Sequence, residues 1–496
     1  MATNLQARAA SADEAAILAA IITGGDDRIR PGPDGRNKYF ATVTPFDGLA
    51  YGSSTISSIS ADALAYLATN WAHRLDELAT APGYAAALNE LRARIEALYG
   101  YSDCEIVIAA SGTDLEYVGL AAAPRGAGPI CGILLGRDEV GSGCIHSAAG
   151  RFFAERTAIG AEVVTAQPID PRHAANRLVD VPIRDADGTP RASAAITADL
   201  EARADEAIAA GEHPIIHVVH GSKTGLTLPS LDDCASLAAR FGTAATIVVD
   251  ACQLRISPAA VRAYLDLGCI VLATGSKSAN GAPFSGFALV PPDLISAAAP
   301  LTDGFRLLAR RAEWPTVWPG RELLADEANA GLALRLAGAL FEIERFSTIQ
   351  ESRVFEMVDD FRAALAGAVA KHSLALLPTD GPDGAMPACL AATLATLDMS
   401  QRWPTLDFEA AGKIHHALTH ALPPPGQPAF RVGQPVRARR LADGRFAATL
   451  RLSLSMPMMV EHAALDRTAS RVRLANELDY ILGEIAALAG VYAANC

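Results

Sequence analysis

The sequence predicts an α/β fold: a large domain with a mostly parallel sheet of the seven-stranded type flanked by helices, and a smaller α+β domain at the C-terminal end. The chain has 496 residues, half of them hydrophobic, which is enough for about two to four domains. Between about residues 100 and 295, short apolar segments alternate with helical segments, as in a parallel sheet covered on both faces. After Pro291 this pattern gives way to long Ala- and Leu-rich helices separated by short strands.

The first hundred residues are predicted to be mainly helical. Ala15–Thr23 is apolar and follows two acidic residues, so it is typical of an amphipathic helix and not of a secretory signal. A Gly-, Pro- and Asp-rich stretch follows at Gly24–Gly35, and leucines recur at helical spacing from Ser60 to Tyr99. We expect three regions, an N-terminal extension (1–50), a large domain (51–310) and a small C-terminal domain (311–496).

The strands and helices of both domains follow from the apolar segments. The predicted strands of the large sheet are short and rich in Val, Ile and Leu, as strands buried on both faces are. In chain order they are Glu105–Ala110, Ile130–Leu135, Glu162–Thr165, Ile215–Val219, Ala245–Val249, Ile270–Ala273 and Phe287–Val290. The small domain is predicted to contain helices at Leu323–Phe346, Ser352–Ala370 and Ala464–Leu488, with strands at Leu374–Leu377, Leu390–Leu397, Ala429–Val432 and Ala447–Leu454.

The charge and the cysteine content argue against several kinds of partner. Acidic residues outnumber basic ones by 55 to 42, so the chain as a whole is not expected to bind nucleic acid or an anionic membrane surface. None of the eight cysteines lies within three positions of another, so no CxxC metal or redox pair exists. No apolar run approaches the ~18 residues that span a bilayer. We therefore expect a cytoplasmic protein that has no metal site.

A glycine follows the first predicted strand, in the sequence Ser111-Gly112-Thr113, and a helix is predicted to begin there. Backbone N–H groups at a helix N-terminus, together with a hydroxyl, form a phosphate-binding site. A second interpretation remains open, because Thr113 and Glu116 also match the T-x-x-E capping box, which satisfies the helix end without a ligand.

Two further candidate residues follow later strands. Asp250 comes directly after Ala245–Val249, where open α/β sheets bind ligands. A carboxylate buried there needs a cationic partner, which a protonated pyridine nitrogen would provide, although the residue could also cap a loop. Lys277 follows Ile270–Ala273 among small residues, and Leu267–Gly286 contains no other charge. A lysine in such a pocket can form a Schiff base, whereas an ordinary lysine of this kind is at the surface.

In this order, the turn, the acid and the lysine resemble the pyridoxal-phosphate enzymes of fold type I, and within them the class V aminotransferase and cysteine desulfurase group. The resemblance covers about residues 50–460. It implies pyridoxal 5′-phosphate as the cofactor, with Lys277 as the catalytic Schiff-base lysine and Asp250 beside the pyridinium nitrogen. The other cofactor-binding residues that it implies are Gly112, Thr113 and Ser276 at the phosphate and Gln253 near the phenolic oxygen.

The same resemblance implies a substrate site. Ala448–Ser453 resembles the family's R-x-S strand, in which Arg451 would bind the substrate carboxylate in a bidentate pair. The turn at Tyr51–Ser60, which contains Ser54, resembles the turn that lines the family's substrate pocket.

The segments after the second and fourth predicted strands depart from the family pattern. The residue that stacks on the cofactor ring is His146 or, in a different alignment, Val140, and we prefer His146. Ser222 is expected near the ring oxygen, and His220 near the substrate. Lys223 is expected to be a solvated turn residue.

We therefore expect a homodimeric enzyme, with its active site near the subunit interface, that acts on a free amino acid as an aminotransferase does. The alternative is a C–C lyase or synthase on the same scaffold, either kynureninase-like or of a decarboxylative or aldol type. A non-catalytic binding protein of this fold and a nicotinamide-dependent dehydrogenase are more distant alternatives. Desulfuration is disfavoured, because it needs a mobile cysteine and Cys389 directly precedes a predicted strand. His217 and His220 lack a third metal ligand.

Overall fold

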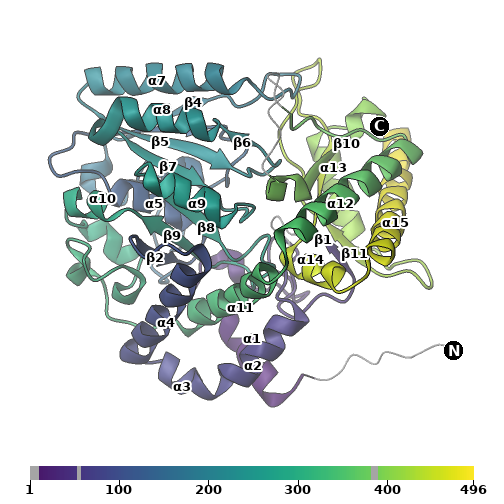
Figure 1. The fold of residues 1–496 in the computed structure, drawn as a ribbon, viewed down its shortest axis with the longest axis horizontal. Helices are drawn as coiled ribbons and strands as arrows, with labels where there is room; N and C mark the ends of the chain where they lie inside the picture. The colour runs from purple at the N-terminus through teal and green to yellow at the C-terminus, as the bar shows by residue number, and fades with distance from the viewer. Residues whose placement is uncertain (1–9, 53–56, 381–388, 496) are drawn as a thin grey trace.

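A mostly parallel sheet forms the centre of the computed structural model, which describes residues 10–52, 57–380 and 389–495 (Figure 1). The strand order is β2-β9-β8-β7-β5-β3-β4, and the short strand β6 pairs with β5. The pairs β8–β7, β7–β5, β5–β3 and β3–β4 are parallel, whereas β9 pairs antiparallel with both β8 and β2. The strands are β2 Glu105–Ala109, β3 Ile130–Leu135, β4 Arg177–Val181, β5 His213–His220, β6 Thr227–Leu228, β7 Thr246–Asp250, β8 Ile270–Thr274 and β9 Gly286–Val290. The predicted fold class is confirmed.

The third predicted strand is wrong. Glu162–Thr165 forms only an isolated bridge between Glu162 and Arg156, and the edge position beside β3 is taken by β4 at Arg177–Val181. Strand β4 exposes Arg177 and Asp180, because one of its edges has no neighbouring strand. A half-exposed edge strand lacks the continuous apolar run that identifies its buried neighbours.

Helices cover both faces of the sheet. Neighbouring residues of a strand point to opposite faces, and Val248 shares an apolar cluster with α5, whereas Val249 shares another with α7, α8 and α9. Helix α5 therefore covers one face and the other three cover the opposite face. Their bounds, with those of the short helices α6 and α10, are α5 Gly112–Ala121, α6 Cys144–Ser147, α7 Ser193–Ala209, α8 Leu231–Phe241, α9 Pro258–Asp266 and α10 Pro292–Ala297.

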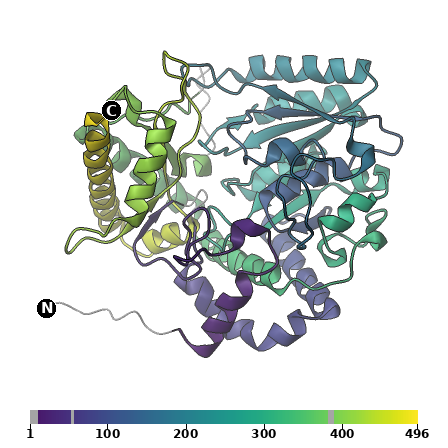
Figure 2. The ribbon, with the colours of Figure 1, turned by 180° about the vertical axis from the view of Figure 1, so that it is seen from behind.

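The N-terminal segment belongs to the folded body of the protein. Helix α1 buries Ile17 and Ile21 and contacts α2 and α11, and α11 in turn packs on α4. From behind, the purple segment that follows α1 runs between the sheet and the C-terminal elements (Figure 2). The helices are α1 Ala12–Ile21, α2 Ala61–Asn70, α3 Leu75–Leu78, α4 Ala81–Tyr99 and α11 Ala330–Ser347.

The C-terminal elements form a separate α+β layer with its own apolar cluster. Strand β10 pairs antiparallel with β12, and β11 pairs parallel with β1 from the N-terminal region. The elements are β1 Leu49–Tyr51, β10 Leu394–Asp398, β11 Phe430–Val432, β12 Thr449–Ser453, α12 Glu351–Lys371, α13 Phe408–His420, α14 Met456–Ala463 and α15 Arg467–Ala494.

Two predicted C-terminal strands differ from the structure. Leu374–Leu377 makes only a single bridge through Leu376, and the strand predicted at Leu390–Leu397 begins at Leu394 because Cys389–Thr393 forms a turn of 3₁₀-helix. Short apolar runs do not distinguish a strand from a helical turn. Across the described ranges, no helix has the length and apolar character needed to cross a membrane.

Candidate active site

A cavity of about 280 Å³ lies at the carboxyl edge of the parallel strands. Asp250 ends β7, Thr274 ends β8, and Gly112 begins α5 just after β2. These chain ends meet at the edge where open α/β sheets bind ligands. The lining includes the predicted residues Gly112, Thr113, Asp250, Gln253, Ser276, Lys277 and Arg451.

The turn that carries Lys277 is fixed by the packing of α11. A Cβ atom added to Gly275 would lie 2.3 Å from the Cβ of Ala339, and one added to Gly281 would lie 2.7 Å from the same atom. The small residues around Lys277 are thus required by the close approach of α11. The Oγ of Ser276 accepts a hydrogen bond from the backbone N–H of Ser285 at 2.9 Å, which holds the turn closed while Lys277 lines the cavity.

Asp250 lines the same cavity and is held by the backbone. Its Oδ1 accepts a hydrogen bond from the backbone N–H of Cys252 at 2.9 Å. The charge of Asp250, after burial itself, raises the pKa of the Cys252 thiol well above its usual value, whereas the charge of Lys277 opposes this shift. Both ionic groups therefore act on the same thiol across a short distance. Gln253 is buried, and its Oε1 accepts from Nη1 of Arg255 at 3.3 Å.

The N-terminus of α5 opens into the cavity. Ser111 is its N-cap, and the Ser111 Oγ accepts a hydrogen bond from the N–H of Asp114. The predicted capping box of Thr113 and Glu116 is not formed, because the helix begins at Gly112, one residue before Thr113. The carboxylate of Glu116 is buried instead, 2.9 Å from Nδ1 of His217. The first N–H groups of a helix lack partners within it, so those of Gly112 and Thr113 can be offered to an anion, whereas that of Asp114 is used by the N-cap.

Arg451 supplies a cation with an unused donor. Its side chain is buried, and Nε donates to the carbonyl oxygen of Gln434 at 2.8 Å. Nη1 has no hydrogen-bond partner among the described residues, although it is shielded from solvent. Burial lowers the pKa of Arg451 to about 10, so the group stays charged at neutral pH. A buried cation with an unused donor at a cavity wall suits an anionic ligand.

Sequence reasoning missed two cationic residues that line this cavity. Lys223 is half-buried there, and burial together with the charges of Arg451 and Lys277 lowers its pKa to about 8. The expectation of a solvated turn residue is wrong. Its position just after a buried strand, like that of Asp250, was the available signal. The second residue, Arg28, comes from the N-terminal segment, and nothing in its local sequence distinguishes it.

Several predicted site residues lie elsewhere. Neither Val140 nor His146 lines the cavity, whose wall at this point is formed by Gly141, Ser142 and Cys144. Val140 is buried in the apolar core, and His146 lies beyond Cys144 on the same helical turn.

Two residues at or just after the end of β5, His220 and Ser222, also differ from expectation. The Oγ of Ser222 donates to the carboxylate of Glu139 at 2.7 Å, so this hydroxyl is used to hold a buried Glu139–Arg184 ion pair. His220 faces a different, largely apolar cavity, where its Nδ1 lies 3.3 Å from the hydroxyl of Tyr264. Neither side chain lines the cavity that contains Lys277.

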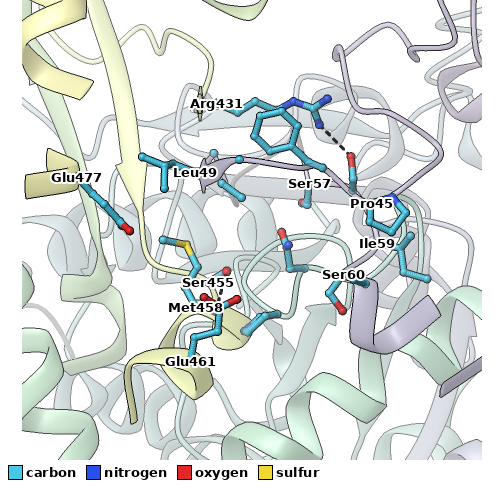
Figure 3. Close-up of a pocket in the computed structure, with 18 of the residues that line it drawn as sticks. Pro45, Leu49, Ser57, Ile59, Ser60, Arg431, Ser455, Met458, Glu461 and Glu477 are labelled. Atoms are coloured by element: carbon cyan, nitrogen blue, oxygen red, sulfur yellow. Dashed lines mark hydrogen bonds between the residues drawn. The ribbon is translucent and has the colours of Figure 1, made fainter. Parts of the chain in front are cut away.

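Ser54 lies outside the described residues. Its described neighbours Gly52 and Ser57 line a second cavity, of about 170 Å³, which Figure 3 shows between Pro45, Arg431, Met458 and Glu477. The Oγ of Ser57 also donates to the carbonyl oxygen of Ser276. Since Asn280 lines this second cavity, the turn at 276–280 separates it from the cavity of Lys277.

Two solved structures have the same fold over nearly their whole length. A NifS-like protein aligns with a TM-score of 0.55 and 11% sequence identity, covering 88% of this chain and 99% of that chain. Pyridoxamine-pyruvate aminotransferase from Mesorhizobium loti aligns with a TM-score of 0.51 and 13% identity, covering 90% of this chain and 97% of that chain. No protein-family model matches the sequence, and no curated protein matches it. The similarity confirms the fold that the sequence resemblance implied.

Proposed function

We propose that this protein is a pyridoxal-phosphate-dependent enzyme that acts on an amino acid. The observation that carries the proposal is that Lys277, Asp250, the N-terminus of α5 and the buried Arg451 line one cavity. A Schiff-base lysine, an acid for a pyridinium nitrogen, a phosphate-binding helix end and a carboxylate-binding cation are the four groups that this chemistry requires. The NifS-like protein and the aminotransferase share the fold, which supports the same proposal.

The residues of the cavity fit this cofactor in size and charge. A Cβ atom at Gly112 would lie 2.9 Å from both the Sγ of Cys252 and the Cγ2 of Thr274, so only glycine lets the helix end approach the strand ends so closely. The residues of the turn, Gly112 and Thr113, line the cavity and have N–H groups for a phosphate. In the same cavity, Nη1 of Arg451 is a buried donor that no described residue uses.

Each residue has a distinct role in the proposed reaction. When bound, pyridoxal phosphate supplies an electron sink that stabilises negative charge at the substrate Cα. Lys277 would hold the cofactor through Nζ, and the same Nζ would move a proton at the substrate Cα. Asp250 holds a proton at the ring nitrogen. Arg451 binds the substrate carboxylate and so orients the bonds at Cα.

We propose amino-group transfer as the reaction, with a C–C lyase or synthase as the second candidate. Both start from the same residues and differ in which bond at Cα or Cβ breaks. Incubation with a panel of amino acids and an acceptor 2-oxo acid distinguishes them, because transfer yields a new amino acid and a new 2-oxo acid, whereas a lyase yields two fragments of the substrate carbon chain. The homodimer stays a prediction, which light scattering after gel filtration would check.

The covalent attachment is the direct test of the proposal. Protein mixed with pyridoxal phosphate and reduced with borohydride is expected to carry one adduct, which peptide mass mapping places on Lys277. Lys277→Ala should carry none, whereas Lys413→Ala, at an exposed position on α13, should behave as the parent protein does. An adduct that is absent from the parent protein, or that survives in Lys277→Ala, would rule the proposal out.

A further inference from the structure

Arg28 reaches the candidate phosphate site from the N-terminal segment. Its Nη2 donates to the Oγ of Ser111 at 2.9 Å, and its Nη1 donates to the Oγ1 of Thr113 at 3.3 Å. These hydroxyls belong to the N-cap and the second residue of α5. The side chain of Arg28 is 13% exposed and lines the same cavity as Lys277. The guanidinium thus lies beside the helix end at which a phosphate would bind.

The orientation of this guanidinium is fixed without any ligand. Asp26 accepts from Nε at 2.8 Å and from Nη2 at 2.6 Å, which leaves Nη1 and one edge of Nη2 directed at α5. The rings of Phe153 and Phe284 lie against it, with centroids 4.8 and 4.9 Å from Cζ. A planar guanidinium held by a carboxylate and by ring faces loses little further entropy when an anion binds.

The segment that carries Arg28 is itself anchored by α11. Arg335 is fully buried and donates to the carbonyl oxygens of Ile21, Thr23 and Gly24 at 2.5 to 3.0 Å. Its Nε donates to the carbonyl oxygen of Phe284 at 2.8 Å, so one side chain positions both the end of α1 and a ring that covers Arg28. The N-terminal segment is therefore built into the wall of the cavity.

We propose that Arg28 binds the phosphate group of the cofactor, so that the chain's own N-terminal segment completes the phosphate site. This inference rests on the proposed function, because it assumes the same bound molecule. A guanidinium and the hydroxyl of Thr113, next to the N–H groups of a helix end, match the oxygens of a phosphate monoester. The hydroxyl of Ser111 already donates to Oδ2 of Asp114. The hydroxyl of Thr113 accepts from Arg28, and its own proton can be donated to one of those oxygens.

The test compares two ligands that differ only in the phosphate. Dissociation constants for pyridoxal phosphate and for pyridoxal are measured by absorbance titration in the parent protein, in Arg28→Gln and in the control Arg30→Gln. Arg30 is two positions away and exposed, and it pairs only with Asp27 among the contacts of the described chain. We expect Arg28→Gln to weaken the binding of pyridoxal phosphate by about tenfold to 100-fold, which is the range for losing a hydrogen bond to a charged group. The binding of pyridoxal should weaken by less than about threefold. Arg30→Gln should leave both constants unchanged.

A second measurement, the ³¹P resonance of the bound phosphate, distinguishes a lost phosphate contact from a change in folding. The ³¹P resonance of the bound phosphate is expected to be independent of pH in the parent protein and in Arg28→Lys, and to titrate in Arg28→Gln. Equal weakening of pyridoxal phosphate and pyridoxal in Arg28→Gln, or an unchanged affinity for both, would overturn the role of Arg28 while leaving the attachment to Lys277 intact. A parent protein that forms no adduct at Lys277 would overturn the proposed function itself.

Discussion

Two fully buried arginines show how this protein distinguishes a structural cation from one available to a ligand. Arg335 lies where α11 meets the N-terminal segment, and its three nitrogens donate to four backbone carbonyl oxygens. Arg451 lies at the cavity wall, where Nε has one carbonyl partner and Nη1 has none among the described residues. Burial lowers the pKa of both, to about 9 and about 10, so both are cations at pH 7.

Arg335 and Arg451 differ in whether the protein itself provides acceptors for their N–H groups. A buried donor without a partner costs about 1 to 3 kcal/mol, and at a cavity wall a ligand can provide the partner. The carbonyl groups around Arg335 belong to the last residue of α1, to the two residues Thr23 and Gly24 that follow it, and to Phe284. The carbonyl oxygens at a helix end lack partners within the helix. Arg335 thus serves the fold, whereas Arg451 is available to a bound anion. Each prediction below tests one side of this contrast.

The largest effect is expected for Arg335→Met. This change removes a donor from four carbonyl oxygens, of which only that of Gly24 keeps another among the described residues, from Nδ2 of Asn329, and we expect the free energy of unfolding to fall by about 3 to 5 kcal/mol. Urea denaturation followed by circular dichroism measures this value. Arg203→Met, which removes an exposed pair with Glu206, should change it by less than about 1 kcal/mol. Equal losses in the two variants would contradict a structural role for Arg335.

For Arg451→Met we expect a small change in stability and a large change in substrate binding. Stability should change by less than about 1 kcal/mol, because a buried charge with few partners is replaced by an apolar side chain. Binding of an amino-acid substrate should weaken by about 100-fold, and that of the corresponding amine without a carboxylate should not change. The exposed Arg437→Met serves as the control. Weaker binding of amine and amino acid alike would show that Arg451 does not bind the carboxylate.

A smaller effect is expected for Lys223. Its pKa of about 8 means that it is charged at pH 7 and becomes neutral as the pH rises above 8. Binding of propionate, a carboxylate without an amine, should therefore weaken by about tenfold between pH 7 and pH 9, the energy of one charge-assisted contact. Lys223→Met should remove this pH dependence, and the exposed Lys413→Met should keep it. Calorimetric titration at each pH decides between these results.

The smallest effect concerns Asp114, next to the candidate phosphate site. Burial raises its pKa to about 7, opposed by Arg28 and the hydrogen bond from Ser111 and reinforced by Asp26 and Glu313. As the pH rises through 7, the carboxyl becomes anionic and repels a phosphate. We expect the parent protein to lose about threefold more affinity for pyridoxal phosphate than Asp114→Asn between pH 6 and pH 8.5. Parallel pH profiles for the two proteins would exclude this repulsion.

The sequence predicted that the catalytic candidates lie close together. Asp250 and Lys277 each follow a continuously apolar strand, and the carboxyl ends of parallel strands necessarily meet at one edge of the sheet. Gly112 comes soon after β2, which runs parallel to these strands, so it reaches the same edge of the sheet. The local pattern therefore predicted the neighbourhood of these residues, while their chemical roles stay predictions.

Residues that do not follow a buried strand could not be assigned to the cavity from the sequence pattern. Arg28 lies in the 3₁₀-helical turn Asp27–Ile29, and long-range contacts, such as those with Phe153 and Phe284, bring it to α5. The preference for His146 as the ring-stacking residue stays a prediction, although on the short helical turn Cys144–Ser147 it is Cys144, and not His146, that lines the cavity. Periodicity is too coarse to resolve such a turn.

By itself, the sequence determined the alternation of buried strands and helices, and with it the edge of the sheet where Asp250 and Lys277 meet. Apolar burial acts on every residue of a strand and so leaves a mark in the local composition. Only the tertiary structure decided that Arg28 and Lys223 line the cavity beside Arg451, which the sequence resemblance had already implied, since the three residues come from separate regions of the chain. Long-range packing sets their direction, and a single charged side chain carries no local pattern that records its distant partners.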